Sequence, residues 1–379
     1  MNYQSTKNFV ISTVGTSLLT KQINKSNLDE KDWMKDLINH ANLTSENTPK
    51  KVIDIIDSLK VRVRENLSKQ DLTSIRKSSA ELNGIYGLYD NKIEQNKQDI
   101  HWLVATDTAQ GQATAELVQE FLEQYNISVQ ILTPKELSAA NTDVFRSAID
   151  KILEWMDNTI PSYKESGYQI IFNLVGGFKS LQAYLNTIGM FYADEILYIF
   201  EGENSELIKI PQLPINIDYS QIKPVEFALM NAGLELKASD LVGVPQTLLF
   251  QVEEEFTLST WGLLIWNKAK NELLSGEPLP FERIQYETSF IKDYNKVKNN
   301  SERIKLQETL AKASALLIKH NGNIAYLKED GGILYEVYTN KKDIAHFRVT
   351  QGIRVSCICV EGKLILRHYG KEPDVNRNP

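Results

Sequence analysis

The sequence predicts an α/β protein in which a parallel sheet forms the first part of the chain and a smaller α+β domain forms the last part. Up to residue 200, short β-rich apolar runs alternate with segments of helical period, which is typical of a parallel sheet. Turns rich in glycine and hydroxyl side chains directly follow three of these runs. After residue 280 the order changes to one strand, two helices and an antiparallel meander.

The first domain is expected to span residues 1–215. Its first strand is predicted at residues 8–14, and the segment 27–94, which has a helical period, is expected to cover one face of the sheet as an insertion. Further strands are predicted at residues 101–105, 129–132, 168–175 and 195–200, and helices at residues 113–125, 144–156 and 179–193.

Residues 216–280 are expected to form a connector, which contains a helix after residues 258–266 and ends in a linker at 275–280. The last domain, residues 281–379, is predicted to begin with a strand at 281–287 and helices at 289–298 and 301–320. Strands joined by hairpin turns are then predicted at residues 333–338, 345–350, 353–360 and 363–369.

Composition limits the compartment and the class of protein. The 379 residues are 42% hydrophobic and 24% charged, which is ordinary for a globular chain of two or three domains. No apolar run approaches the ~18 residues of a membrane span and the first residues are polar, so we expect a cytoplasmic protein with no membrane partner. The two cysteines, Cys357 and Cys359, would share one face of a strand, so neither a disulfide nor a zinc site is expected.

The net charge of −7 is unevenly distributed along the chain. Residues 281–379 contain 17 Lys and Arg against 12 Asp and Glu, a balance of +5, which leaves −12 for residues 1–280. A polyanion is therefore expected to bind the last domain rather than the first.

Three polar loops follow strands of the predicted sheet, and the carboxyl ends of parallel strands meet at one edge. Their backbone N–H groups, hydroxyls and helix N-termini favour phosphates. Neither the dinucleotide motif G-x-G-x-x-G nor the Walker motif is present, which disfavours an NAD or mononucleotide site. The candidate ligand-binding residues in these loops are Gly15, Thr16, Ser17, Thr106, Asp107, Gly176, Gly177 and Lys179.

These loops resemble those of a known family. Residues 13–19 (Thr-Val-Gly-Thr-Ser-Leu-Leu), 105–108 (Ala-Thr-Asp-Thr) and 173–180 (Asn-Leu-Val-Gly-Gly-Phe-Lys-Ser) are similar to the CARF sensor domains of type III CRISPR defence, and residues 258–266 resemble the connector after such sensors. The resemblance implies a Rossmann-like sensor in a homodimer, whose two copies together bind a cyclic oligoadenylate. Cyclic tetra-adenylate is the expected activator.

The last domain resembles the RelE family of mRNA interferases. Residues 289–296 (Ser-Phe-Ile-Lys-Asp-Tyr-Asn-Lys) are similar to the family's first helix, residues 345–360 to its paired strands, and residues 370–377 to its ending. The resemblance implies a ribosome-dependent endonuclease that cleaves mRNA without a metal or other cofactor. In such a reaction an RNA 2′-OH attacks the adjacent phosphate and leaves a 2′,3′-cyclic phosphate.

Five basic residues are the candidate catalytic groups. Alternation along a strand puts His346 and Arg348 on one face, and Arg354 lies on the next strand of the same hairpin. Lys371 and Arg377 are expected to follow the last strand and to close over that face. His346 is the candidate general base, because histidine ordinarily titrates near neutrality.

The sequence leaves alternatives for the proton donor and for the class of effector. Glu372 and Asn376 stand where the RelE family commonly has a basic residue and a tyrosine, so His368 or Tyr369 could supply the proton. A CARF-linked metal nuclease, for which residues 235–237 (Glu-Leu-Lys) are a partial motif, and a ligand-controlled nucleic-acid-binding regulator are the alternatives. A HEPN ribonuclease is excluded, because no histidine has an arginine five to seven residues before it.

Overall fold

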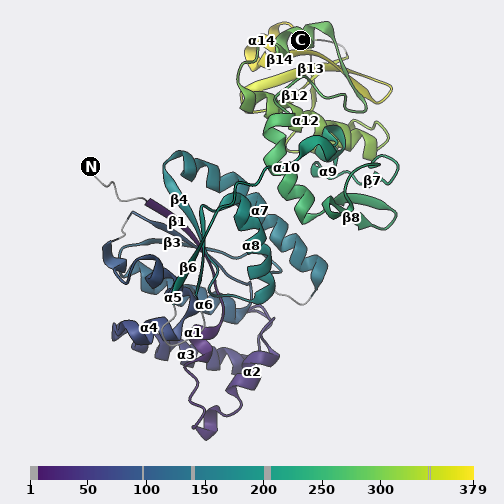
Figure 1. The fold of residues 1–379 in the computed structure, drawn as a ribbon. Helices are drawn as coiled ribbons and strands as arrows, with labels where there is room; N and C mark the ends of the chain where they lie inside the picture. Colours follow the sequence, from purple (N-terminus) through teal and green to yellow (C-terminus); the bar gives the residue numbers. More distant parts are fainter. Residues whose placement is uncertain (1–6, 96–97, 138–140, 200–205, 340, 342) are drawn as a thin grey trace, which may run out of the picture. The chain divides into compact units, whose positions relative to one another are not determined.

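The structure, a computed structural model, describes residues 7–95, 98–137, 141–199, 206–339, 341 and 343–379. Its contacts divide the chain into two compact units, Met1–Asn216 and Ile217–Pro379, each of which is described by itself (Figure 1). Residues 217–280, expected to be a connector, fall within the second unit. Phe200, the last residue of an expected strand, lies outside the described residues.

The first unit is built on a six-stranded sheet with the order β3-β2-β1-β4-β5-β6. β1 pairs in parallel with β2 on one side and β4 on the other, and its residues from Phe9 to Thr13 are buried, as expected for a central strand. The predicted parallel arrangement is confirmed for five strands, whereas β6, which was not predicted, is antiparallel to β5. The strands are β1 Lys7–Thr13, β2 Ile100–Val104, β3 Ser128–Leu132, β4 Tyr168–Asn173, β5 Glu195–Ile199 and β6 Leu207–Pro211.

Helices cover both faces of this sheet (Figure 1). α6 begins after Thr108, whose Oγ1 accepts a hydrogen bond from the Gly111 N–H at 3.1 Å, and α7 begins after Asn141, whose Oδ1 accepts one from the Asp143 N–H at 2.8 Å. α6 begins before residue 113 and α7 continues past residue 156, so both are longer than predicted. The helices that follow strands are α1 Ser17–Thr20, α6 Ala109–Glu123, α7 Thr142–Glu165 and α8 Lys179–Tyr192.

The segment from residue 27 to 94 is helical, as predicted, and shares a hydrophobic core with α6. α5 approaches β4 closely because it carries Gly84, where a Cβ would overlap the side chain of Asn173. α3 buries one apolar stripe at helical spacing, formed by Val52, Ile55, Ile56, Leu59, Val63 and Leu67. The helices are α2 Trp33–Asn39, α3 Lys50–Ser68, α4 Leu72–Ser78 and α5 Ala80–Leu88, with 3-10 turns at Leu28–Glu30 and Ile93–Gln95.

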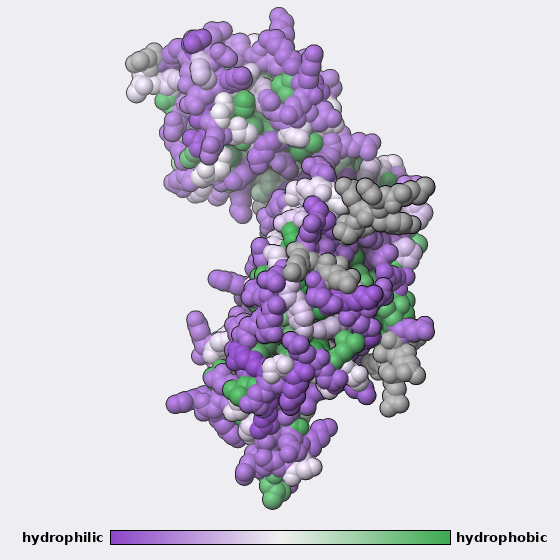
Figure 2. Space-filling model, turned by 90° about the vertical axis from the view of Figure 1, so that its left-hand side faces the viewer, coloured by the Kyte–Doolittle hydropathy of each residue, from purple (hydrophilic) through white to green (hydrophobic). Residues whose placement is uncertain are grey.

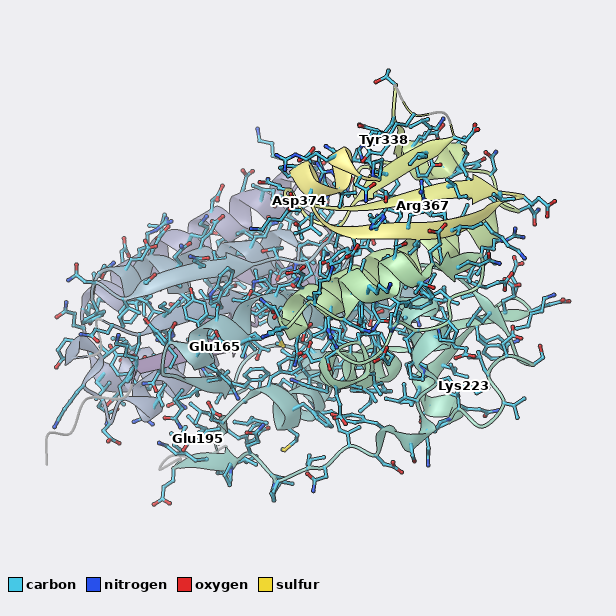
Figure 3. The ribbon with its side chains drawn as sticks, turned by 90° about the horizontal axis from the view of Figure 1, so that it is seen from above. Glu165, Glu195, Lys223, Tyr338, Arg367 and Asp374 are labelled. Atoms are coloured by element: carbon cyan, nitrogen blue, oxygen red, sulfur yellow. The ribbon has the colours of Figure 1, made fainter. Side chains whose placement is uncertain are left out.

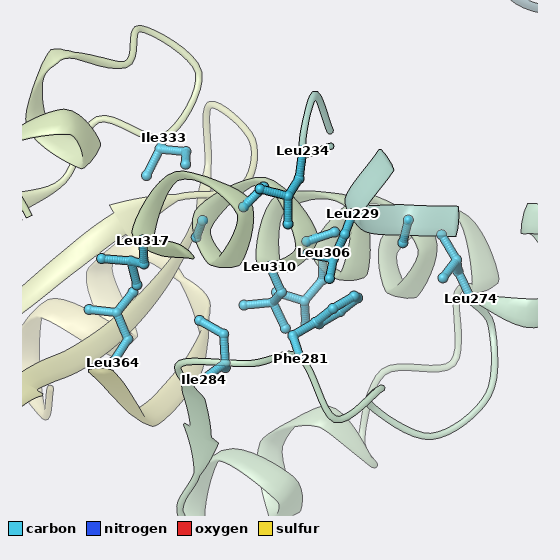
Figure 4. Packing of buried hydrophobic residues seen from close by; sticks show 14 of the residues in the cluster. Leu229, Leu234, Leu274, Phe281, Ile284, Leu306, Leu310, Leu317, Ile333 and Leu364 are labelled. Carbon is cyan, nitrogen blue, oxygen red and sulfur yellow. The ribbon is translucent and has the colours of Figure 1, made fainter. Parts of the chain in front are cut away.

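The second unit has one hydrophobic core, to which residues on both sides of the 275–280 linker contribute. Figure 4 shows Leu229 and Leu274 in the same cluster as Phe281 and Leu310. The predicted helix after residue 258 is present as α10, and it begins after Ser259. The elements before the linker are α9 Pro224–Asn231, β7 Leu236–Lys237, β8 Leu249–Val252, β9 Glu255–Leu258 and α10 Thr260–Leu273, with 3-10 turns at Tyr219–Gln221 and Gln246–Leu248.

The rest of the second unit contains a five-stranded sheet with the order β10-β14-β13-β12-β11. The predicted sequence of one strand, two helices and a meander is present, but β14 extends to Lys371, β11 has only two residues, and residues 372–377 form an additional helix, α14. Pro373 is compatible with this helix because the first N–H groups of a helix have no intrahelical partner. The elements are β10 Ile284–Tyr286, α11 Thr288–Tyr294, α12 Asn300–Lys319, α13 Ala325–Glu329, β11 Glu336–Val337, β12 Ile344–Arg348, β13 Ile353–Val360, β14 Lys363–Lys371 and α14 Glu372–Arg377.

The visible surface is mainly polar. In Figure 2 hydrophilic residues predominate, and hydrophobic residues form small groups between them. Within the described ranges, no helix combines the length and the apolar content that crossing a bilayer would require.

Candidate functional site

The loops after β1 and β4 lie against each other at the carboxyl edge of the parallel sheet. A Cβ on Gly15 would lie 3.0 Å from the backbone nitrogen of Gly177, so the two loops touch. The Thr13 hydroxyl donates a hydrogen bond to the Gly176 carbonyl, which ties the end of β1 to the second loop. Gly177 has a φ of +91° and a Cβ there would lie 2.9 Å from that of Thr13, so the position requires glycine. Three predicted ligand-binding residues are thereby brought together.

A buried glutamate of α5 lies beneath both loops. Oε1 of Glu81 accepts a hydrogen bond from the Gly15 N–H at 2.6 Å, and Oε2 accepts one from the Ser79 hydroxyl at 2.7 Å. The Glu81 carboxyl group also fills the space that a Cβ on Gly176 would need. Burial raises the pKa of Glu81, because removal from water disfavours the charged carboxylate. Sequence reasoning missed Glu81 because a glutamate in a charged helical segment is typical of a solvated surface. The nearby Gly84 is the one signal that this helix approaches the sheet.

The start of α8 provides groups that suit an anion. Phe178 is the N-cap residue and makes no side-chain hydrogen bond, so the first N–H groups of this 14-residue helix lack a side-chain partner. Lys179 is the first residue of α8 and is exposed. On the loop after β1, Thr16 precedes α1, and Oγ of Ser17 is buried with no hydrogen-bond partner among the described residues. N–H groups, an ammonium group and an unpaired hydroxyl are the donors that phosphates bind.

The loop after β2 lies on the other side of β1 from the β4 loop. The hydroxyls of Thr106 and Thr108 are hydrogen-bonded to each other at 2.9 Å. Oδ2 of Asp107 accepts a hydrogen bond from the Glu136 N–H at 2.7 Å, whereas Oδ1 is buried without a partner. Because a carboxylate repels a phosphate, Asp107 suits a ribose hydroxyl or a base amino group better than a phosphate.

Three of the five candidate catalytic residues share one face of the C-terminal sheet. The register places His346 opposite Ser356 and Arg348 opposite Arg354, and side chains directly opposite each other point to the same face. Phe347, on the other face of β12, is fully buried in the core. The register therefore brings together the three residues that alternation along the strands predicted.

Arg354 is buried, whereas the sequence predicted a cation on an open face. Its Nη1 donates to the backbone carbonyls of Thr350 at 2.9 Å and Gln351 at 3.3 Å, which closes the turn between β12 and β13. Its Nη2 forms an ion pair with Oε2 of Glu372 on α14 at 3.2 Å. Because only 6% of the Arg354 side chain is exposed, a phosphate reaches it only if Glu372 moves.

His346 is partly buried beside Tyr338, which is marked in Figure 3. The ring centroids are 4.6 Å apart, and Nε2 of His346 lies 3.8 Å from Oε2 of Glu336. Burial lowers the pKa of His346, the positive charge of Arg354 lowers it further, and Glu336 opposes both effects. The neutral imidazole is thereby favoured, and this is the form that a general base requires.

The other two candidate catalytic residues lie at the end of the chain. Lys371 does not follow the last strand as predicted but is the last residue of β14, and its side chain is exposed. It lies opposite Ile353, one position from the pair of Arg354 and Gly370, so alternation places it on the other face of the sheet from Arg354 and it does not close over the predicted face. Arg377 does not close over the face as predicted: 80% of its side chain is exposed, and its guanidinium pairs with Asp374, marked in Figure 3. The reason is that residues 372–377 form a helix, whose last turn carries Arg377.

Tyr338 is a residue that sequence reasoning missed at this site. Its hydroxyl donates to Oδ1 of Asn376 on α14 at 2.7 Å, so α14 is tied to the segment before β12. Glu235 and Lys237, the partial metal-nuclease motif, are exposed. In the described part of the chain, no three His, Cys, Asp or Glu side chains are arranged to hold a metal ion.

Part of the first unit matches the model of a known family. Residues 76–213 match the model of a family described as CRISPR-associated protein (Cas_APE2256). The matched segment contains α5 with Glu81 and the loops of Thr106 and Gly177, whereas the Gly15 loop and the second unit lie outside it. The first unit is thus similar to a CRISPR-associated family, and this similarity supports a CRISPR-related role for the chain.

Proposed function

We propose that this chain is a ligand-gated RNA endonuclease of a CRISPR system, in which a CARF-type first unit binds a cyclic oligoadenylate and the second unit cleaves mRNA. The observation that carries the proposal is the meeting of the Gly15 and Gly177 loops beside the start of α8 and Lys179. Part of this site lies within the segment similar to a CRISPR-associated family. Its donors suit the phosphates of an oligonucleotide.

The symmetry of the ligand gives the reason for a homodimer. A cyclic oligoadenylate repeats the same nucleotide around a ring, and one chain offers one set of loops. Two chains related by a two-fold axis present equivalent loops to the two halves of a ring with an even number of nucleotides. Among such even rings, cyclic tetra-adenylate, which the CARF resemblance implies, is the activator that we propose.

The proposed reaction uses the groups on the sheet face without a metal. His346 takes the proton from the RNA 2′-OH, which then attacks the adjacent phosphorus. Arg348 and Arg354 stabilise the charge that develops on the phosphate, and Arg354 does so after its ion pair with Glu372 opens. Lys371, which the register places on the other face of the sheet, would bind a neighbouring phosphate of the RNA. Arg377, exposed at the end of α14, would bind the RNA backbone. Translating ribosomes would hold the mRNA in the reactive geometry, which is why the proposed activity depends on them.

The test combines the purified chain with translating ribosomes and mRNA, in the presence and absence of cyclic tetra-adenylate, and maps the ends of the products. We expect internal cuts that depend on the activator and that leave a 2′,3′-cyclic phosphate. His346→Gln should slow the cuts, whereas His320→Gln, at the end of α12, is the matched control. Cleavage lost when metal ions are chelated from a crosslinked ribosome complex would favour the metal nuclease, and activator-dependent nucleic-acid binding without cleavage would favour the regulator.

A further inference from the structure

The second unit contains a cavity of about 760 Å³ at one end of its C-terminal sheet. The segment that joins α11 to α12, the start of β13, the end of β14 and α14 line this cavity. Lys371 and Ile353, which lie opposite each other in the register, are among its lining residues. The cavity therefore extends onto the face of the sheet away from Arg354, and of the five candidate catalytic residues it contains Lys371 alone.

Two lysines give this cavity positive charge that its carboxylates do not neutralise. Lys298, between α11 and α12, and Lys371 are exposed and have no hydrogen-bond or ion-pair partner within the described residues. Each carboxylate of the lining, in contrast, is engaged by another side chain: Asp293 by Lys296 at 2.8 Å, Glu302 by the Tyr369 hydroxyl at 2.7 Å and Asp374 by Arg377 at 3.8 Å. The two unpaired ammonium groups can therefore bind a phosphate without first breaking an ion pair.

The same cavity has apolar walls and an oriented amide. Val297, Ile353 and Val375 are lining residues, and all three are buried or partly buried. Asn299 is the N-cap residue of α12, and its Oδ1 accepts a hydrogen bond from the Ser301 N–H at 2.9 Å. This bond fixes the amide and leaves Nδ2 as a donor without a partner among the described residues. Apolar walls suit the faces of a nucleobase, and an amide donor suits an acceptor on its edge.

The register shows how the cavity is placed relative to the proposed catalytic face. Gly370 lines the cavity and lies directly opposite Arg354, and residues paired in this way are about 5 Å apart. His346 and Arg348 do not line the cavity, so it does not enclose the reacting phosphate. An RNA strand whose phosphate lies at Arg354 nevertheless has its neighbouring nucleotides within reach of the cavity.

We propose that this cavity binds one nucleotide of the mRNA strand close to, but not at, the scissile bond, and that it selects the base there. This inference rests on the proposed function. Lys298 and Lys371 bind the phosphate of that nucleotide, the apolar walls contact its base, and Nδ2 of Asn299 donates to an acceptor on the base edge. The cavity thus contributes affinity and sequence preference, whereas the reacting atoms remain on the other face of the sheet.

The experiment measures single-turnover cleavage of ribosome-bound mRNA, with activator present, as a function of protein concentration. Lys298→Gln should raise the concentration that gives half the maximal rate by about tenfold, the effect of losing one charged phosphate contact, while the maximal rate changes by less than about twofold. Lys319→Gln is the matched control, because this exposed lysine lies at the other end of the 20-residue α12, about 30 Å away. It should match the parent in both quantities.

A map of the cuts in a pool of mRNA sequences tests the selection of the base. The parent should prefer one base at a fixed distance from the cut, and Asn299→Ser should reduce that preference about fivefold or more. Serine still caps α12 but lacks the amide donor, so this variant removes the proposed contact without removing the cap. Thermal unfolding verifies that each variant is folded.

The outcomes separate this inference from the proposed function. If the parent cleaves but Lys298→Gln needs no more protein than Lys319→Gln, the cavity does not bind the RNA, while the endonuclease function stands. If Lys298→Gln does need more protein but the map is the same for the parent and Asn299→Ser, the cavity binds a phosphate without selecting a base, as ribosomal RNA would supply, and the inference is wrong. If the parent does not cleave at any concentration, the proposed function is wrong and this inference is wrong with it.

Discussion

The Glu81 side chain contacts both glycine loops of the first unit, the loop of Gly15 and the loop of Gly176. Its carboxyl group accepts the Gly15 N–H and fills the space beside Gly176, so it shapes the candidate ligand site from beneath the loops. Glu81→Ala leaves the Gly15 N–H unpaired, at a cost of roughly 1–3 kcal/mol, and frees both loops. We expect cyclic tetra-adenylate to bind about tenfold more weakly or worse, as measured by calorimetry.

Glu81→Gln is the matched control for this prediction, because its amide oxygen can still accept the Gly15 N–H. It should bind the activator nearly as well as the parent. Equal binding by Glu81→Ala and the parent, with circular dichroism showing both folded, would mean that Glu81 does not position these loops.

Glu372 neutralises Arg354 in the structure, with the two side chains 42% and 6% exposed. Glu372→Gln removes this charge but keeps an oxygen that can accept from Arg354, which also stays bonded to two turn carbonyls. Because Arg354 is buried, the variant should lose some stability, and thermal unfolding verifies that the unit remains folded. We expect up to about fivefold faster cleavage at limiting mRNA, because Arg354 is freed for the phosphate. Glu329→Gln, an exposed carboxylate on α13, should have no effect. A rate unchanged by Glu372→Gln would show that this ion pair does not limit access to Arg354.

At the scale of elements, β1 and β2 begin in a buried polar cluster at the edge opposite the ligand loops. The Tyr89 hydroxyl lies 2.9 Å from Oδ2 of Asp99 and 2.7 Å from Nε2 of His101. Burial lowers the pKa of His101 to about 3, because the interior disfavours the charged ring. Burial of Asp99 raises the pKa of its carboxyl group, so it has the opposite effect on the pH dependence of stability.

This cluster predicts how the stability of the first unit depends on pH. Between the unfolded pKa of histidine, ~6.5, and the folded value of about 3, the unfolded chain binds a proton at His101 that the folded chain does not. The free energy of unfolding should therefore fall by about 1.4 kcal/mol per pH unit as the pH drops below 6.5. His101→Gln, which can still accept from Tyr89, should lose less stability between pH 7 and pH 5 in denaturant titrations. Equal losses in both proteins would contradict the assignment, since Asp99 affects both alike.

The elements differ in how well their own residues specify them. β1 and β4 are buried along most of their length, and β2 and β5 are buried in part, so each contains an apolar run that the sequence identifies. β6 depends on antiparallel pairing with β5, and α14 begins with Glu372 and Pro373 directly after a strand, so neither has a local signal of comparable strength. The burial of Arg354 arises from the carbonyls of the adjacent turn and from Glu372 on α14, and neither contact can be deduced from alternation along a strand.

The candidate ligand site likewise contains some residues that the sequence predicts and one that it does not. Gly15, Gly176 and Gly177 could be predicted because glycines after parallel strands gather at one edge of a sheet. Glu81 could not, because its hydrogen bond to the Gly15 N–H joins elements that are far apart in the sequence. For this residue the position of a neighbouring helix, rather than the local pattern, decides the role.

At the scale of the whole molecule, the proposed sensor requires two chains for one ring. We expect light scattering to give twice the mass of one chain when cyclic tetra-adenylate is present, and calorimetry to give one ring per two chains. A monomer with one ring per chain would mean that a single set of loops surrounds the ligand.

The central claim is that a ligand of the first unit switches on RNA cleavage by the second. The direct measurement is the rate of mRNA cleavage on translating ribosomes as a function of cyclic tetra-adenylate concentration. Lys179→Glu is compared with Lys151→Glu, an exposed lysine on α7, because Gly177 is held at positive φ and any substitution there would also strain the fold. The account predicts a rate that rises steeply with activator in the parent and in Lys151→Glu but not in Lys179→Glu. The same rate with and without activator, or no cleavage at any concentration, would contradict it.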